Sequence, residues 1–512
     1  MPRTTLLDRI APGNRSAVPP VRPRSLLHRH WIAVSVVAFL VLAGVLGWTR
    51  PWEQCGAGLT AADDVCVGLD LGAAPLRDDD PLADLEALIA DRNAHAGSTF
   101  KTVVVLDDLT PDPDTDSTPI KFVRHGVQGA IAAAWPRPES SGIKLLLANF
   151  GSSAGHWREA VGQIVASAGT EHIAAVTGIG VSLENTRNAV AELSRHGIVT
   201  IGATVTADDL NIDADGKPIK NFFRVGPTNS DEAHAAVNYV AKLPKQRTLL
   251  VADVNEADTY AGTLTKAFQD QQLVPIPFSK KYDSLEGQLT DTSRDEYLQK
   301  LFRGMHSDIC TAQPDVIYFA GRGVDLRSFV YALSNDGACQ QLRSVTVISG
   351  DDTATLVGTK LPLSGDIAVT PLYTALAHPD QWKMFTGNDA ALTYRQNYTD
   401  FLNAFTGTHE FTRDDLFDGA AMIEHDAVAT AVEAAETNPS SSPPSMRNFV
   451  ANIDCNSPVP GATGFIAFRQ DGGNQIDKVL PILRIQEDGT TSPVDLVWSQ
   501  GRPLDTSPSC TS

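Results

Sequence analysis

The sequence predicts an α/β protein built from two doubly wound lobes, each a mostly parallel sheet with helices on both faces. Three observations support this fold class. The chain has 512 residues, which is too long for one domain. Strand-like apolar runs alternate with helical spacings over roughly 300 residues. One stretch, 173–206, contains a complete strand–helix–strand unit, which implies parallel strands joined by a right-handed crossover.

The strand–helix–strand unit is the clearest local signal in the chain. Ile173–Thr177 and Ile198–Ile201 are short apolar runs that predict two strands. Between them, Glu184–His196 has apolar residues at helical spacing, and Gly197 occupies the position of a helix C-cap glycine. Ligands bind beyond the carboxyl ends of strands in such sheets, so the loops 178–182 and 202–206 are predicted to line a site.

The other elements follow in a regular order. Strands are predicted at Thr102–Leu106, Ile143–Ala148, Phe222–Val225, Thr248–Ala252, Ile276–Phe278, Asp315–Ala320, Val345–Ser349 and Ile367–Pro371. Helices are predicted at Leu82–Asn93, Val127–Trp135, His156–Ala166, from near Asp231, and at Thr263–Gln271, Tyr297–Arg303, Asp325–Asn335 and Ala420–Glu436. Residues 51–80 are predicted as a loop region, and 461–485 as a hairpin that turns at Gly472–Gly473.

One segment has the character of a membrane span. Trp31–Trp48 is uncharged and apolar, and at 1.5 Å per residue it would cross roughly 27 Å of bilayer. Arginines precede it and acids dominate after Arg50, which predicts a cytoplasmic N-terminus and an extracellular body. A cleaved signal peptide is the alternative, but the segment lacks a small-residue cleavage site. We therefore expect a single-pass protein of the cell membrane, anchored through residues 31–48.

Charge and cysteine content agree with an exported body. The chain carries a net charge of -20, and residues 1–30 contain six arginines and one aspartate, so the rest is still more acidic. Such a surface is a poor partner for nucleic acid. An even number of cysteines suggests disulfides in an oxidising compartment. Other connectivities are open, but we expect neighbours to pair, as Cys55–Cys66, Cys310–Cys339 and Cys455–Cys510.

Motifs for catalysis, cofactors and metals are missing from the sequence. It contains no G-x-S-x-G, H-E-x-x-H or G-x-x-x-x-G-K-[ST] pattern. Leu183 stands where a dinucleotide-binding loop would need its third glycine. We therefore predict a protein that is not an enzyme and has no cofactor.

Eight segments, in the same order, resemble the type I periplasmic-binding-protein fold, and within it the branched-chain amino acid ABC transporter substrate-binding proteins. They are IKLLLANFGSS, AAVTGIGVSLENT, HGIVTIGATVTADDL, FFRVGPTNSDEAHA, TLLVADVNEADTYAGTL, PDVIYFAGRGVDLRSFV, TVISGDD and GATGFIAFRQDGGN. Ala261 and Arg469 replace the glycine and aspartate of the family pattern, and the loop Thr110–Pro119 differs from the family's short loop.

The resemblance implies a domain organisation. Lobe 1 would comprise about 100–224 plus 375–450, and lobe 2 about 225–374 plus 451–495, with a hinge between them. Residues 1–30 would be a disordered cytoplasmic tail, 49–99 a cysteine-containing extracellular segment, and 496–512 a C-terminal tail.

The resemblance also implies a ligand site between the lobes. Lobe 1 would contribute Ser182, Thr204 and Thr206, with the helix after Ser182 able to bind a carboxylate through its backbone N–H groups. Lobe 2 would contribute Tyr260, packed on the ligand, and Asp351, facing an ammonium group. Each of these residues has an ordinary structural alternative, such as capping a helix or turn.

Arg322 departs from the family pattern. In the cleft its guanidinium would favour an acidic or bidentate ligand, and the alternative is a solvated loop position. The resemblance predicts a binding protein that captures an amino acid or similar small polar metabolite for an ABC permease. The uncleaved anchor leaves a second possibility open, a ligand-sensing receptor that signals through another membrane partner.

Overall fold

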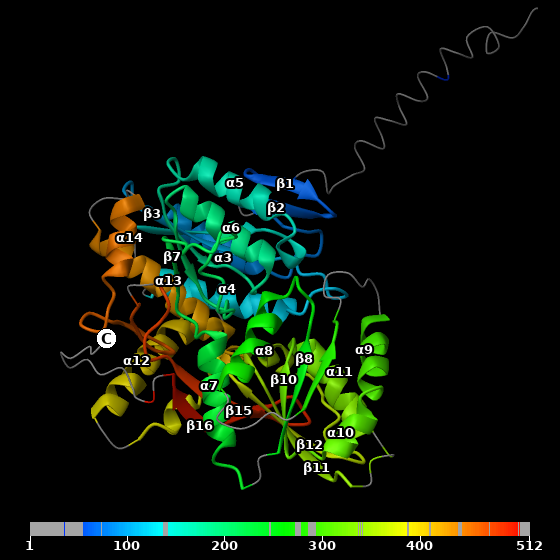
Figure 1. Ribbon diagram of the computed structural model, residues 1–512. Coiled ribbons are helices and arrows are strands. Elements are labelled where there is room, and N and C mark those ends of the chain that lie inside the picture. The colour runs from blue at the N-terminus through cyan, green and yellow to red at the C-terminus, as the bar shows by residue number, and fades with distance from the viewer. Residues whose placement is uncertain are drawn as a thin grey trace, which may run out of the picture. The chain divides into compact units, whose positions relative to one another are not determined.

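The computed structural model describes Ser35 and most of residues 55–501 (Figure 1). Within that range, the structure does not describe residues 73, 137–141, 245–246, 272–277, 285–292, 336, 338, 340, 387–388, 409–410, 439–442, 470–471 and 500. All helices and strands named below lie in the unit Gln54–Ser512. No helix of the described part is both long and apolar enough to cross a bilayer. The predicted anchor, Trp31–Trp48, lies outside the described residues apart from Ser35.

Two sheets organise the chain, as predicted (Figure 1). Within the described residues the first sheet has seven strands in the order β1-β2-β4-β3-β5-β6-β7. They are β1 (Leu59–Ala62), β2 (Val65–Leu69), β3 (Lys101–Asp107), β4 (Ile143–Asn149), β5 (Ile173–Gly178), β6 (Val199–Gly202) and β7 (Phe222–Arg224). The five strands from β4 to β7 in this order are parallel, so their carboxyl ends share one edge.

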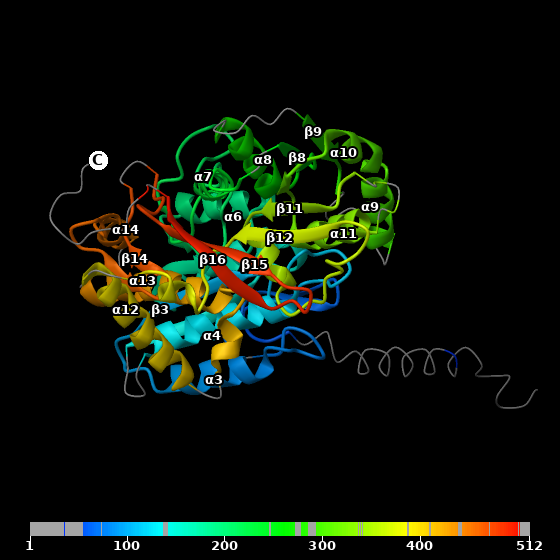
Figure 2. The same cartoon turned by 90° about the horizontal axis from the view of Figure 1, so that it is seen from below.

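The second sheet has the order β16-β15-β12-β11-β10-β8-β9 over the described ranges. Its strands are β8 (Thr248–Asp253), β9 (Phe278–Tyr282), β10 (Val316–Ala320), β11 (Ser344–Ser349), β12 (Ala368–Thr374), β15 (Val479–Ile485) and β16 (Thr491–Trp498). The strands from β9 to β12 are parallel, and β15 and β16 are antiparallel additions (Figure 2).

Helices cover both faces of each sheet because each sheet has two buried apolar faces. The first sheet packs against α3 (Ala83–Ala94), α4 (Ile120–Ala134) and α13 (Ala420–Thr437) on one face, and α5 (Trp157–Ser167) and α6 (Glu184–Arg195) on the other. The second sheet packs against α7 (Asn229–Val240) and α8 (Thr259–Gln271), and against α9 (Ser293–Arg303), α10 (His306–Ala312) and α11 (Gly323–Ser334). Such layering buries strands with few polar residues, which explains the apolar runs in the sequence.

The late part of the chain returns to the first core before it joins the second sheet. Helices α12 (Asp389–Thr406) and α14 (Pro443–Ala451) and the small hairpin β13 (Val459–Gly461) and β14 (Gly464–Ile466) pack there, beside α13. Only β15 and β16 then enter the second sheet. The predicted lobe boundaries themselves stay predictions.

Local signals at helix ends were read correctly from the sequence. Gly197 follows α6 with φ +77°, and Ile198 N–H donates to the Leu193 carbonyl, which closes the helix. Thr228 caps α7 in a reciprocal capping box with Asp231.

Two predicted regions differ in the structure. Residues 51–80, expected as a loop, contain the hairpin of β1 and β2, which turns at Asp63 and Asp64 with positive φ. A turn of this kind needs positive φ, and Asp-Asp gives a weaker signal for it than the usual glycine. The expected hairpin over 461–485 is confirmed only next to its turn, where Phe468 and Gln475 form an antiparallel bridge and Ile476 N–H donates to the Ala467 carbonyl. The longer strands pair elsewhere, β14 with β13, and β15 with β12 and β16.

Two of the three expected disulfides are confirmed. Cys55–Cys66 and Cys310–Cys339 are bonded. Cys455 is also disulfide-bonded, and its expected partner, Cys510, lies outside the described residues. Neighbour pairing was therefore the right expectation for the first two bonds.

The close packing of α4 on α13 generates a prediction. A Cβ at Gly129 of α4 would lie 2.0 Å from the Ala421 carbonyl oxygen of α13, so the helices must separate to admit it. We expect Gly129→Ala to lower the free energy of unfolding by about 1–3 kcal/mol. The matched control is Gly162→Ala in α5, where no atom lies within 4 Å and the change should stabilise by about 0.5–1 kcal/mol. Chemical denaturation measures both, and equal effects at the two positions would contradict the packing argument.

Candidate functional site

The site lies where loops from the carboxyl ends of both sheets meet. On the first sheet, the loop after β5 begins with three residues of positive φ, at Gly178 (82°), Ile179 (76°) and Gly180 (60°). Positive φ is rare for a β-branched residue such as isoleucine, so this turn is locally strained. A Cβ at Gly180 would lie 2.8 Å from Phe150 and 3.0 Å from Asp107. Glycine is therefore needed at position 180 for the protein's own packing.

Ser182 and Thr204 tie the two predicted loops to each other. The Ser182 hydroxyl accepts hydrogen bonds from the backbone N–H groups of Thr206 (3.0 Å) and Ala207 (3.1 Å). Thr204 Oγ1 donates to the Gly180 carbonyl at 2.5 Å. Ser182 does not cap the following helix, because Leu183 occupies the N-cap position of α6.

Arg322 is the centre of the contacts between the sheets. Its side chain is only 2% exposed, so the solvated-loop interpretation is wrong. Nε and Nη2 donate to the two Asp258 carboxylate oxygens, each at 2.7 Å, and Nη1 donates to Asp352 at 3.0 Å. Nη2 also donates to the Ser182 carbonyl of the first sheet's loop at 3.0 Å. A bidentate pair of this kind uses the planar fork of arginine, which lysine lacks.

The two aspartates that pair with Arg322 also accept hydrogen bonds from backbone N–H groups in the first turns of two helices. Asp258 accepts from Ala261 N–H in the first turn of α8, at 3.2 Å, and Asp352 accepts from Gly323 N–H at the start of α11, at 2.6 Å. The Asp352 carboxylate therefore caps the start of α11 and does not cap the turn that follows Asp352 in sequence. One guanidinium thus connects the starts of two helices with a loop of the opposite sheet.

A second contact between the sheets joins Thr206 to Asp351. Thr206 Oγ1 donates to Asp351 Oδ1 at 3.2 Å, and both residues are buried. Burial, followed by the charge of Asp352, raises the pKa of Asp351 to about 7.

Glu232 lies beside Asp351 and accepts a hydrogen bond from its backbone N–H. Burial and the charge of Asp351 raise the pKa of Glu232 well above its usual range. Its Oε2 accepts from Asp351 N–H and from Thr374 Oγ1, both at 2.8 Å, whereas Oε1 has no donor. Two buried carboxyl groups this close disfavour each other's ionised form, which raises the pKa of both.

Tyr260 completes the group from the second residue of α8, which begins earlier than predicted. Its ring lies 4.8 Å from the Arg322 guanidinium carbon, and its hydroxyl accepts from Asp352 N–H at 3.3 Å. The resemblance predicted that this ring packs on a ligand. In the structure the ring packs on the Arg322 guanidinium.

The structure brings five of the six predicted residues into one network, namely Ser182, Thr206, Tyr260, Arg322 and Asp351. Thr204 lies outside this network, and its hydroxyl donates to the Gly180 carbonyl in the loop that carries Ser182. Sequence reasoning missed Asp258, Asp352 and Glu232, whose roles depend on partners far away in the chain. Whether any of these residues contacts a ligand stays a prediction.

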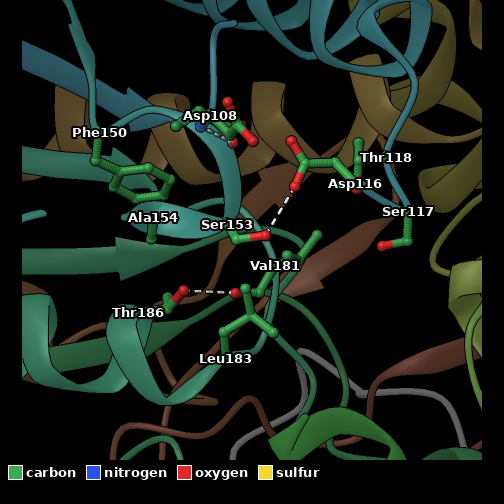
Figure 3. Close-up of a pocket in the computed structure, with 11 residues that line it drawn as sticks. Asp108, Asp116, Ser117, Thr118, Phe150, Ser153, Ala154, Val181, Leu183 and Thr186 are labelled. Atoms are coloured by element: carbon green, nitrogen blue, oxygen red, sulfur yellow. Dashed lines mark hydrogen bonds between the residues drawn. The ribbon is translucent and has the colours of Figure 1, made fainter. Parts of the chain in front are cut away.

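A small cavity adjoins the network on the side of the first sheet (Figure 3). The centre of a water-sized sphere can occupy about 20 Å³ of it, which is room for about one water molecule. Its lining comes from loops after β3, β4 and β5 and consists of Asp107, Asp108, Asp116, Ser117, Thr118, Phe150, Ser153, Ala154, Val181, Leu183 and Thr186. Asp116–Thr118 belong to the loop that departs from the family pattern.

Comparisons with known proteins identify the fold. No protein-family model matches the sequence, and no curated protein matches it. The leucine-binding protein LivK from Thermotoga maritima superposes with a TM-score of 0.55 at 16% identity, over 77% of this chain and 98% of that one. LivJ from Streptococcus pneumoniae, in complex with isoleucine, gives 0.54 at 16% identity, over 78% and 99%. A solute-binding protein from Rhodopseudomonas palustris, in complex with p-hydroxybenzoic acid, gives 0.57 at 12% identity, over 79% and 98%.

These likenesses confirm the predicted fold. The chain has the two-lobed fold of type I periplasmic binding proteins, and the solved structures it resembles are solute-binding proteins.

The Arg322 network generates a stability prediction. Arg322→Met would leave the buried carboxylates of Asp258 and Asp352 without their cation, so we expect a loss of about 3–5 kcal/mol in the free energy of unfolding. The matched control is Arg327→Met, because Arg327 pairs with Asp295 at a half-exposed position and its removal should cost less than about 1 kcal/mol. Urea titration measures both values. A small effect of Arg322→Met would show that the network does not hold the sheets together.

Proposed function

We propose that this protein binds a small zwitterion, such as an amino acid, between its two sheets and delivers it to an ABC-type permease. The observation that carries the proposal is the pair of hydrogen bonds that cross between the sheets. Arg322 donates to the Ser182 carbonyl, and Thr206 donates to Asp351. These bonds join groups that a ligand of this class would need, and they lie at the carboxyl ends of parallel strands, where this architecture binds its ligands.

A zwitterion would replace both crossing bonds with bonds of its own. Its carboxylate would take the Arg322 Nη2 donor that now serves Ser182. Its ammonium group would take the Ser182 carbonyl, the Thr206 hydroxyl and the Asp351–Glu232 pair. Hinge opening would separate the groups, and closure on the ligand would bury it.

The resembled structures support a small ligand with a carboxyl group. Their bound molecules, isoleucine and p-hydroxybenzoic acid, are both small and both carry a carboxyl group. The strongly buried arginine is a donor suited to that group.

A thermal-shift screen of the full chain against amino acids, amides and short peptides tests the proposal. We expect at least one amino acid to stabilise the protein saturably, by about 2.7 kcal/mol at a hundredfold excess over Kd. Asp351→Asn should weaken that ligand at least about tenfold, because its ammonium group loses a charged partner. Asp366→Asn, at an exposed position, is the control and should change nothing. A folded sample that responds to no member of the panel would contradict the proposal.

We further propose that Trp31–Trp48 anchors the protein in the cell membrane, with residues 1–30 in the cytoplasm and the body outside. The support is the uncharged length of the segment, its flanking tryptophans and the arginines before it.

Membrane fractionation tests the anchor. The full chain should stay in the membrane through an alkaline wash and keep its N-terminal residues. Phe39→Arg with Leu40→Arg should release it, since each arginine costs about 2.5–3.5 kcal/mol at the centre of a span. The control is Leu6→Arg with Leu7→Arg, outside the segment. Recovery of a soluble chain that lacks its first residues would instead establish a cleaved signal peptide.

A further inference from the structure

The cavity beside the network is lined by acids, and none of them pairs with a cation among the residues that the structure describes. Asp107 and Asp108 stand at the end of β3, and Asp116 faces them from the following loop (Figure 3). Asp116 accepts hydrogen bonds from Ser152 Oγ (2.9 Å), Ser153 Oγ (2.7 Å) and Asp112 N–H (2.7 Å).

Two oxygen atoms in this lining lack partners. Asp108 is nine-tenths buried, and its Oδ1 has no hydrogen-bond partner. Thr118 Oγ1 is a second buried oxygen without a partner. Buried polar groups are nearly always hydrogen-bonded, so two such atoms on one cavity indicate that a further hydrogen-bonding group can be bound there.

The acidic lining of the cavity favours a bound group that carries a positive charge. Burial, followed by the charges of Asp116 and Asp107, raises the pKa of Asp108 well above its usual range. Glu424 of α13 adds a further acid next to Asp107. Arg294 of α9 reaches the loop that carries Asp116, where it donates to the Thr115 carbonyl (3.2 Å), and it also donates to Asp325 (2.9 Å). A water could fill the space, but a cation would also relieve the repulsion between the carboxylates.

Size and donor number point to one kind of cation. The described residues hold no group of histidines, cysteines or carboxylates placed to bind a metal ion. The space admits one water-sized group, and a primary ammonium group is of that size and has three donors in a compact head. Phe150, Ala154, Val181 and Leu183 supply apolar surface for the carbon next to it.

We propose that this cavity binds the primary ammonium group of a small amine, with Asp108, Asp116 and Thr118 as its acceptors. The inference goes beyond the proposed function, because loops of the first sheet alone line the cavity, whereas the amino-acid site lies between the sheets. The two sites are neighbours, since Val181 and Leu183 of the cavity flank Ser182 of the network.

Binding releases a proton. Burial and the neighbouring carboxylates raise the pKa of Asp108, and an ammonium group favours its carboxylate form; wherever Asp108 is protonated in the free protein, its proton therefore leaves to solvent on binding. Affinity therefore rises with pH while Asp108 is protonated in the free protein, up to about tenfold per pH unit for one proton released. It falls again only where the amine loses its own proton.

Calorimetric titration of the full chain tests the proposal. The probes are ammonium chloride and methylammonium chloride at pH 6 and pH 8, with sodium, potassium and tetramethylammonium chlorides at equal ionic strength as controls. Both probes should bind saturably and more tightly at pH 8. Heats in buffers of different ionisation enthalpy should show release of about one proton. Sodium, potassium and the bulky tetramethylammonium should give no saturable heat.

Variants assign the effect to the cavity. Asp108→Asn should weaken methylammonium binding at least about tenfold and abolish proton release. Glu86→Gln in α3 is the matched control, because Glu86 is also a buried acid of raised pKa, about 9, but does not line the cavity. Thr118→Val keeps the charge and should weaken binding several-fold with proton release intact, which tests the site even if Asp108→Asn fails to fold. Asp366→Asn, at an exposed position away from both sites, is a second control and should leave methylammonium binding unchanged.

Two outcomes would overturn the proposal. A folded wild-type protein without saturable ammonium or methylammonium binding would mean that the cavity holds water alone. Equal binding by Asp108→Asn, or equal heats with sodium and potassium, would mean that the cation binds elsewhere.

Discussion

The buried guanidinium of Arg322 is the interaction on which the arrangement of the two sheets depends. It neutralises two carboxylates, Asp258 and Asp352, that themselves hold the first turns of α8 and α11. Its remaining donor reaches the Ser182 carbonyl on the other sheet. A charge taken out of water is tolerated only when its partners are complete, so the positions of all these elements are coupled. Any ligand that enters between the sheets must compete for that last donor.

Carboxyl groups set the electrostatic character of this region. Burial raises the pKa of Asp351 and Glu232 on the second sheet, and raises the pKa of Asp107 to about 6 on the first. Each of these groups lies at or near the carboxyl end of a strand, where the architecture places its ligands. An acidic wall on both sides favours ligands that bring positive charge, which an ammonium group provides. The arginine then supplies the counterpart for a carboxylate, so a molecule carrying both charges suits the site better than a purely acidic one.

The loops at the carboxyl edge of the first sheet form two groups: one contacts the opposite sheet, and the other lines the small cavity. The loops after β5 and β6 bind one another through Ser182 and reach the opposite sheet through Thr206. The loops after β3 and β4 enclose the small acidic cavity with Asp108 and Asp116. The segment 181–183 belongs to both, because its side chains alternate between the cavity and the network. A ligand in one place can therefore alter the other through a single short loop.

The sequence by itself determined the features that depend on local spacing. Apolar runs and helical periodicity located most strands and helices, Gly197 and Thr228 marked helix ends, and neighbouring cysteines paired in the two bonds described. The order of motifs then identified the fold. These succeed because periodicity and capping act within a few residues of the chain.

Only the tertiary structure decided which partners the polar side chains have. Arg322 looked like a loop residue because nothing near it in sequence shows that it meets Asp258, 64 residues away, or Ser182, 140 residues away. The hairpin of β1 and β2 gains its strand character from pairing with β4, and the acids after β3 become a cavity only when the loop at 116–118 folds over them. Burial and charge pairing are properties of neighbours in space, so the chemistry of this site follows from contacts that local pattern does not encode.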